Sequence, residues 1–239
     1  MEYVLTAENL TKEYKGFRAL DGLALRVPKG AIYGLVGKNG AGKTTLIRIL
    51  CALQAPTKGG YSLFGVDSGD KAVTQARGRM GAVVEAPAVY QELTAEENLR
   101  IQYKVLGRRD IDAIPGLLEL VGLEGTGKKK VKNFSLGMRQ RLGIAVALAG
   151  DPELLILDEP VNGLDPQGII EMRKLLQRLN RERGTTILIS SHILDELSRL
   201  ATHYGFIDRG RMVEETAATD ITESLEKHYM KLVGGEWNE

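Results

Sequence analysis

A glycine-rich segment at residues 37–44 has the composition and spacing of a phosphate-binding loop. It reads Gly-Lys-Asn-Gly-Ala-Gly-Lys-Thr, follows an apolar run, and precedes a stretch with the apolar period of a helix. Glycines let consecutive backbone N–H groups turn toward phosphate oxygens, and the N-terminus of a helix adds partial positive charge. The segment therefore predicts a nucleotide site. The residues expected to contact the nucleotide are Gly37, Asn39, Gly40, Ala41, Gly42, Lys43, Thr44 and Thr45.

Three side chains at the end of this loop have separate expected roles. The ammonium of Lys43 would reach the β and γ phosphates, where it would also serve catalysis. Thr44 is placed to offer its hydroxyl to Mg²⁺, while Thr45 could hydrogen-bond the α phosphate. The loop thus predicts a nucleoside triphosphate accompanied by Mg²⁺.

Two adjacent carboxylates end an apolar run at residues 154–157. In proteins with this kind of loop, an Asp at the end of a buried strand holds Mg²⁺ through water, which makes Asp158 the expected metal-side residue. Side chains alternate along a strand, so Asp158 and Glu159 need not face the same way. Glu159 is then the candidate general base, which would orient or deprotonate an attacking water.

The elements that must position these residues alternate between strands and helices. Strand-like runs lie at residues 4–10, 23–27, 31–36, 154–157, 185–190 and 204–207. Helical periods lie at residues 43–53, 95–106, 111–121, 136–149 and 166–183. Asp165 followed by Pro166 is a good start signal for the last of these helices. Such alternation predicts an α/β fold with a mainly parallel sheet, and the region without strands, about 85–150, predicts a helical insert.

With these motifs in order, the chain resembles the ATPase subunits of ABC transporters over essentially its whole length. Residues 133–142, Asn-Phe-Ser-Leu-Gly-Met-Arg-Gln-Arg-Leu, resemble the signature segment of that family. The resemblance implies that Ser135 and Gly137 bind the γ phosphate held by a partner subunit, because a Ser at a helix N-cap leaves helix-start N–H groups facing an anion. Leu136 and Met138 depart from the family's usual Gly and Gln at these two positions.

Three further positions gain expected roles from the resemblance. Residues 162–165, Asn-Gly-Leu-Asp, resemble the D-loop, which runs along the interface between two ATPase subunits and so implies a homodimer on ATP binding. His192 ends a strand-like run as the family's H-loop histidine does, which implies contact with the γ phosphate. Tyr14 lies where the family places an aromatic side chain that stacks on adenine.

Glu85 is the most informative departure from the family pattern, since most members have Gln there. A Glu could still accept a proton from water or approach Mg²⁺, so we expect both a catalytic and a metal-side role for it. The sequence Glu-Ala-Pro-Ala-Val-Tyr at 85–90, together with Phe-Ser-Leu-Gly-Met-Arg-Gln-Arg and Pro-Val-Asn-Gly-Leu-Asp, resembles the bacitracin and lantibiotic immunity exporters. That subgroup separates the ATPase from its permease and expels peptide antibiotics.

The resemblance also implies how the chain is organised. It predicts a single ABC ATPase domain over residues 1–239, with a P-loop NTPase core, N-terminal antiparallel strands and an inserted helical subdomain. The core would comprise residues 1–84 and 151–220, the helical subdomain about 85–150 and a C-terminal tail 221–239. We expect the tail, which includes Trp237, to form a helix and a frayed end without chemistry.

Composition narrows the choice of partners and location. The 239 residues carry a formal net charge of +1, which gives no field that would demand nucleic acid. The first eleven residues lack the features of a secretory signal, and no apolar stretch approaches the roughly 18 residues that a membrane span needs. We therefore expect a cytoplasmic protein that is peripheral on the inner face of the membrane through a permease subunit. Cys51 lies in an apolar helical run and is expected in the core.

The leading hypothesis is an ATP-hydrolysing subunit that powers export through a separate membrane permease, with peptide antibiotics as cargo. A general drug or multidrug exporter would share every catalytic residue. A soluble ABC ATPase that acts on nucleic acid or the ribosome usually carries two ATPase units, a coiled coil or a basic arm, and the sequence shows none of these. A P-loop kinase would leave the segments around Ser135 and Asp165 without a purpose.

Overall fold

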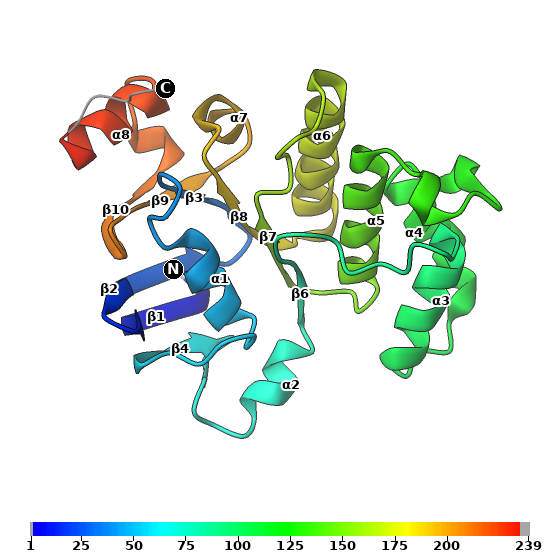
Figure 1. Cartoon of the computed structure of the whole chain (residues 1–239), viewed down its shortest axis with the longest axis horizontal. Coiled ribbons are helices and arrows are strands. Elements are labelled where there is room, and N and C mark those ends of the chain that lie inside the picture. The colour runs from blue at the N-terminus through cyan, green and yellow to red at the C-terminus, as the bar shows by residue number, and fades with distance from the viewer. Residues whose placement is uncertain (1, 235–239) are drawn as a thin grey trace.

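The computed structural model describes residues 2–234, and the central feature of the fold is a sheet of six strands. Its order is β10-β9-β3-β8-β7-β6, in which the inner strands are parallel and β10 runs antiparallel to β9 (Figure 1). The strands are β3 (Ile32–Val36), β6 (Met80–Val83), β7 (Leu154–Asp158), β8 (Thr186–Ser191), β9 (His203–Asp208) and β10 (Arg211–Ala217). The inner strands β3, β7 and β8 are buried along their whole length, as expected for parallel strands covered on both faces.

A second, antiparallel sheet of order β2-β1-β4-β5 lies beside the central one. Its strands are β1 (Tyr3–Tyr14), β2 (Phe17–Pro28), β4 (Lys58–Leu63) and β5 (Val66–Asp67). The predicted fold class is therefore confirmed: an α/β protein with an antiparallel N-terminal sheet and a mostly parallel main sheet.

The helices gather in separate parts of the molecule. They are α1 (Lys43–Leu50), α2 (Val73–Arg77), α3 (Ala95–Val105), α4 (Ile114–Leu120), α5 (Leu136–Leu148), α6 (Pro166–Arg183), α7 (Leu194–Ser198) and α8 (Leu225–Val233). Short 3-10 segments lie at Ile111–Ala113, Glu124–Thr126, Val131–Asn133 and Ala218–Asp220. Figure 1 shows α3, α4 and α5 together on one side, whereas α1 and the antiparallel sheet lie on the other. None of the helices within residues 2–234 has the length and apolar character needed to cross a membrane.

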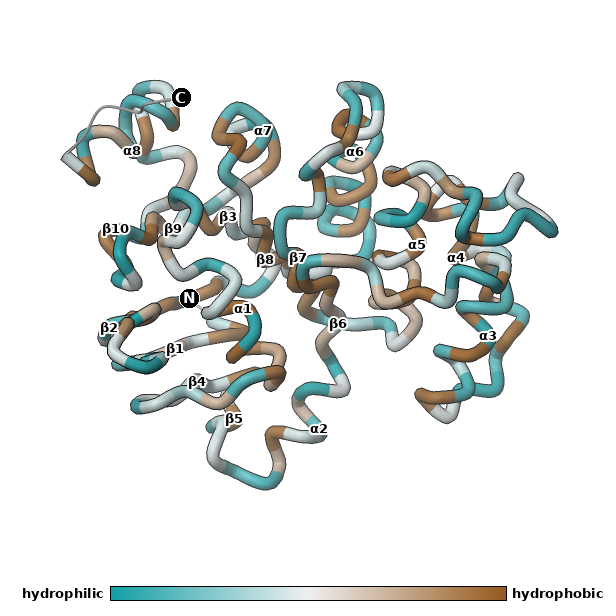
Figure 2. Tube along the Cα trace, viewed as in Figure 1, coloured by the Kyte–Doolittle hydropathy of each residue, from teal (hydrophilic) through white to brown (hydrophobic). Residues whose placement is uncertain are grey.

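The central sheet separates two hydrophobic clusters, and the alternation of its side chains decides which residue joins which. Leu154 and Ile156 of β7 pack with α1 and the antiparallel sheet, while Leu155 and Leu157 pack with the helices on the opposite face. Figure 2 shows these apolar strands as the brown centre of the molecule. The same alternation between the two faces of the sheet sets the direction of polar side chains, such as that of Asp158, at the ends of the strands.

Several strands and short helices were not predicted from the sequence. The strands β4 and β10 are rich in glycine or in charged residues, and α2 and α7 are only five residues long, so their apolar patterns are weak. The helix predicted at 43–53 ends at Leu50, which leaves Cys51 partly buried just beyond it. The expected helix in the tail is present as α8, while Trp237 and the expected frayed end lie outside the described residues.

Candidate nucleotide-binding site

The glycine-rich loop connects β3 to α1 and packs closely against two neighbouring strands. A Cβ atom added at Gly37 would lie 2.5 Å from the carbonyl oxygen of Ile207, and one at Gly42 would lie 2.7 Å from that of Ala19. Gly42 also has a φ of 115°, which L side chains rarely adopt. Only glycine fits at these two positions, so the loop keeps its backbone close to the ends of the strands.

Lys43 is the buried cation of this loop, with only 5% of its surface exposed. Its Nζ donates to the carbonyl oxygens of Gly37 at 2.6 Å and Lys38 at 3.3 Å. Burial lowers the pKa of Lys43, while the neighbouring carboxylates of Glu159 and Asp158 act in the opposite direction. An ammonium held this way, beneath the exposed tip of a turn of backbone amides, fits an oligophosphate anion.

The two carboxylates at the end of β7 point to different surroundings, because the strand ends at Asp158 and the chain turns at Glu159. Asp158 is 3% exposed, and its Oδ1 accepts a hydrogen bond of 2.6 Å from the hydroxyl of Ser190. The same hydroxyl accepts a bond of 3.0 Å from the backbone N–H of Glu159. Glu159 has a φ of 51°, so the chain turns sharply there and carries its carboxylate away from the side of Asp158.

The carboxylate of Glu159 lies between Lys43 and His192. Its Oε1 is 3.5 Å from Nζ of Lys43, and its Oε2 is 2.5 Å from Nδ1 of His192. The side chains of Glu159 and His192 are partly exposed, at 20% and 33%, so a water molecule can reach them. A carboxylate held by a cation and an imidazole can accept a proton from such a water.

These residues meet because the ends of three parallel strands lie in line. Val36 of β3 pairs with Ser191 of β8, and Ser190 pairs with Asp158 of β7. The loop after β3, the carboxylates after β7 and His192 after β8 therefore lie at one edge of the sheet, where open α/β sheets bind ligands.

Ser135 and Gly137 belong to a different part of the molecule. Ser135 caps α5, accepting a bond of 3.2 Å from the N–H of Met138, and its residue surface is exposed. The loop before α6 packs against this helix start, since a Cβ at Gly163 would lie 3.1 Å from Cδ2 of Leu136. Figure 1 shows α5 well apart from α1. The fold therefore does not bring Ser135 to the glycine-rich loop of its own chain.

Tyr14 is the predicted adenine-stacking residue and lies at the end of β1. Its hydroxyl donates to Oε1 of Gln54 at 2.6 Å, while Nζ of Lys12 lies 5.2 Å from the ring centre. The residue as a whole is 37% exposed. The structure thus holds Tyr14 against the segment after α1 with part of its surface accessible, and its stacking role remains a prediction.

Glu85 pairs with Arg48 of α1 through a charge-assisted hydrogen bond. Its side chain is 53% exposed, and it has a φ of 60°. Among residues 2–234 it forms no ion pair with Lys43 and no hydrogen bond with Asp158. The catalytic and metal-side roles expected for Glu85 therefore stay predictions, and the structure adds Arg48 as its partner.

The residues fit a Mg²⁺ ion that arrives with phosphates. No group of three or more His, Cys, Asp or Glu side chains in residues 2–234 could hold a metal unaided. Mg²⁺ in phosphoryl-transfer sites needs only one or two carboxylates beside the phosphates and its own waters. Asp158 supplies one carboxylate, and Thr44 lies partly exposed in the first turn of α1.

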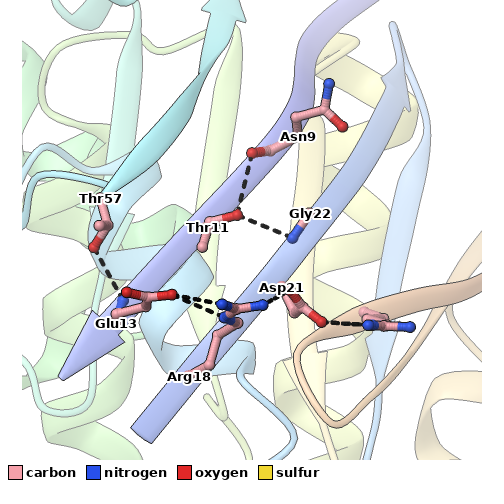
Figure 3. A network of polar contacts seen from close by, with 8 residues as sticks. Asn9, Thr11, Glu13, Arg18, Asp21, Gly22 and Thr57 are labelled. Carbon is pink, nitrogen blue, oxygen red and sulfur yellow. Dashed lines mark hydrogen bonds and ion pairs between the residues drawn. The ribbon is translucent and has the colours of Figure 1, made fainter. Parts of the chain in front are cut away.

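A network of charged residues fixes the antiparallel sheet near the loop (Figure 3). Arg18 pairs with Glu13 at 2.8 Å and with Asp21 at 2.7 Å, and Arg211 approaches Asp21 from β10. Hydrogen bonds from Arg211 and Arg18 lower the pKa of Asp21. The network joins β1, β2 and β10, which are distant in sequence.

This network continues into the glycine-rich loop through the backbone. The N–H of Asp21 donates to the carbonyl of Gly210 at 2.9 Å, and the N–H of Gly210 donates to the carbonyl of Ala41 at 2.8 Å. The loop is thus attached to the turn between β9 and β10.

Sequence reasoning missed two residues of this site. Ser190 has no role in the sequence analysis beyond ending the strand-like run at 185–190, but its hydroxyl bridges Asp158 and the backbone of Glu159, which could be inferred only from the register of β7 and β8. The sequence around Arg48 does not predict a role for it. Its position one turn after Thr44 in α1 matters only because the fold brings Glu85 beside it.

Known proteins resemble this chain in sequence and in fold. The ABC transporter family profile matches residues 20–162. The bacitracin transport ATP-binding protein BcrA of Bacillus licheniformis is 50% identical over 215 residues, which covers 90% of this chain and 70% of the relative. The lantibiotic transport ATP-binding protein SrtF of Streptococcus pyogenes is 42% identical over 224 residues, 94% of this chain and 95% of the relative. A solved ATP-binding subunit of an ABC transporter is 31% identical with a TM-score of 0.84, over 96% of this chain and 99% of that one.

Proposed function

Because the chain belongs to the ABC transporter family as an ATP-binding and ATP-hydrolysing subunit, we propose that it powers the export of peptide antibiotics through a separate membrane permease. The observation that carries the choice of cargo is the similarity, at 42–50% identity, to ATP-binding proteins of bacitracin and lantibiotic transport. In this arrangement the chain sits on the cytoplasmic face of the membrane through the permease and needs no nucleic acid.

Within one chain, each residue of the site has a distinct role in the proposed hydrolysis of ATP. Lys43 and the amides of the glycine-rich loop bind and orient the phosphates. Glu159 accepts a proton from the attacking water, and His192 holds the carboxylate in place. Thr44 and Asp158 would hold Mg²⁺, which when bound neutralises charge on the phosphates.

The second half of each site comes from another copy of the chain. Ser135 is exposed at the start of α5 and stands apart from the loop of its own chain, so its helix-start N–H groups are available to a nucleotide held elsewhere. We therefore place ATP between two copies, with the glycine-rich loop of one facing Ser135 and Gly137 of the other. The division into a core (1–84 and 151–220), a helical part (85–150) and a tail (221–239) is part of this proposal.

Replacing Ser135 by Arg tests the shared site. The variant should bind MgADP within about twofold of the wild type, since its own loop is intact, yet in a Glu159→Gln background its ATP-dependent dimer should weaken at least about tenfold. Calorimetry measures the first quantity and sedimentation velocity the second. A loss of MgADP binding as large as that of a Lys43→Ala chain would place Ser135 in its own chain's site instead.

Replacing Glu85 by Gln tests the acidic character of that position. Since the pair with Arg48 is exposed, its loss should change folding little. Because Gln is the residue that most members of the family have at this position, it should take over the role of Glu85 at the nucleotide, and ATPase activity of the chain alone should stay within about threefold. Peptide resistance of cells that carry the variant should fall, because the acid at position 85 is among the residues on which the resemblance to the bacitracin and lantibiotic immunity exporters rests. Glu92→Gln, which removes an exposed acid paired with Lys132, is the matched control. Full resistance with Glu85→Gln would show that the acidic side chain is incidental.

The choice of cargo is tested in cells that lack the chain. Their sensitivity to bacitracin and to a lantibiotic should rise, while sensitivity to the dye ethidium should not, and a tagged chain should co-purify with a membrane permease. Sensitivity to ethidium alone would favour a general drug exporter. Co-purification with ribosomes and with no membrane protein would contradict the proposed function.

A further inference from the structure

The C-terminal helix α8 contributes a buried hydroxyl that reaches the glycine-rich loop. Leu225 and Tyr229, one helical turn apart, are the buried residues of α8, and Tyr229 has no exposed surface. Burying a phenol is favourable only when its hydroxyl has a partner. The hydroxyl of Tyr229 accepts a hydrogen bond of 3.1 Å from the backbone N–H of Lys38.

The peptide unit that Tyr229 contacts is the one that orients Lys43. The carbonyl of Lys38 accepts bonds from Nζ of Lys43 at 3.3 Å and from the N–H of Ala41 at 3.1 Å. The carbonyl of Gly37, on the other side of the Lys38 nitrogen, accepts the bond of 2.6 Å from Lys43. The Lys38 nitrogen and the carbonyl of Gly37 belong to one planar peptide group, so holding this nitrogen fixes the direction of the carbonyl that accepts the shorter bond from Lys43.

The docking of α8 is tied to the strand pair that leads into the loop. The ring of Phe206 on β9 lies 6.1 Å from the ring of Tyr229 and 5.2 Å from that of His228. Phe206 pairs in register with Val36, the last residue of β3. His228 in turn lies 3.0 Å from Oε1 of Glu214 on β10. A shift of α8 would therefore displace Phe206 and, through it, Val36, which directly precedes the loop.

We propose that Tyr229 is a positioning residue of the nucleotide site, through which α8 sets the affinity of the glycine-rich loop for phosphates. It touches no substrate and acts through the Lys38 peptide and Lys43. Helix α8 is on this account part of the site. The inference rests on the proposed placement of the nucleotide at this loop.

Replacing Tyr229 by Phe removes the hydroxyl and keeps the ring. The Kd for MgADP should rise about fivefold, the size expected for one lost hydrogen bond, while kcat at saturating ATP should change less than about twofold. Hydrogen exchange of the backbone amides in the segment 37–43 should become faster. Both measurements use the full chain.

Tyr204→Phe is the matched control. Tyr204 is 3% exposed and its ring lies 6.0 Å from the ring of Phe206, but its hydroxyl donates to the carbonyl of Leu197 at 3.4 Å, away from the loop. This variant should leave the Kd and the exchange of the loop unchanged. Equal affinity in the wild type and Tyr229→Phe, or an equal loss in both variants, would overturn the proposal. If the wild type bound no MgADP, the proposed site would fail, and the exchange measurement would still decide whether Tyr229 holds the loop.

Discussion

Replacing Glu159 by Gln is expected to stop ATP turnover while the nucleotide stays bound. The amide cannot accept a proton at neutral pH, so the step that activates water loses its base, and kcat should fall about a hundredfold to ten-thousandfold. Gln keeps an oxygen that can face Lys43, so the loop and its buried ammonium should keep their geometry. With hydrolysis blocked, ATP should hold two copies together.

Steady-state phosphate release and sedimentation velocity with ATP and Mg²⁺ check both effects. Glu153→Gln is the control, because Glu153 precedes the same strand β7 at its opposite end and pairs with Arg79 on the surface. It should hydrolyse ATP at nearly the wild-type rate. Unchanged hydrolysis in the Glu159 variant would refute the role assigned to this carboxylate.

Replacing Lys43 by Ala should remove nucleotide binding itself. The ammonium is the only cation that the structure buries within the described part of the loop, and hydrogen bonds from a charged donor to phosphate are worth about 1.5–3 kcal/mol, so the Kd for MgADP should rise about a hundredfold. Hydrolysis at any practical ATP concentration should disappear with it. Glu159 would lose a cation 3.5 Å away and would face His192 alone.

Isothermal titration with MgADP measures this loss, and circular dichroism shows whether the fold survives. Lys71→Ala removes an exposed lysine before α2 and is expected to bind nucleotide as the wild type does. Comparable affinity in the Lys43 and Lys71 variants would mean that the nucleotide binds elsewhere on the chain.

The fold was predictable where the apolar pattern is strong. Continuous apolar runs at β3 and β7 mark buried parallel strands, and the helix that begins at Pro166 starts where Asp165 caps it, with a bond of 2.8 Å from the N–H of Gly168. The helix over residues 166–183 is confirmed at both ends. The edge strand β10 was not predictable, because its sequence has few apolar residues among charged ones and none of its side chains is fully buried.

The sequence predicted those parts of the site whose residues lie close together along the chain. The glycine-rich loop and the carboxylate pair are each contiguous, so their motifs identify Lys43, Asp158 and Glu159 directly. Tyr229 lies 191 positions from Lys38, and nothing in its own neighbourhood signals contact with a phosphate-binding loop. Contacts of this kind depend on tertiary packing, which one sequence does not reveal.

The register between β7 and β8 limits which changes in chain length the protein can tolerate. Asp158 faces Ser190 across the ladder, and an insertion of one residue within β8 ahead of Ser190 would place the aliphatic side chain of Ile189 in the position of that hydroxyl. A buried carboxylate would then lose its donor, and the backbone N–H of Glu159 would lose an acceptor. Insertions and deletions should therefore accumulate in the connections around α6, while the strand that carries Ser190 keeps a fixed length.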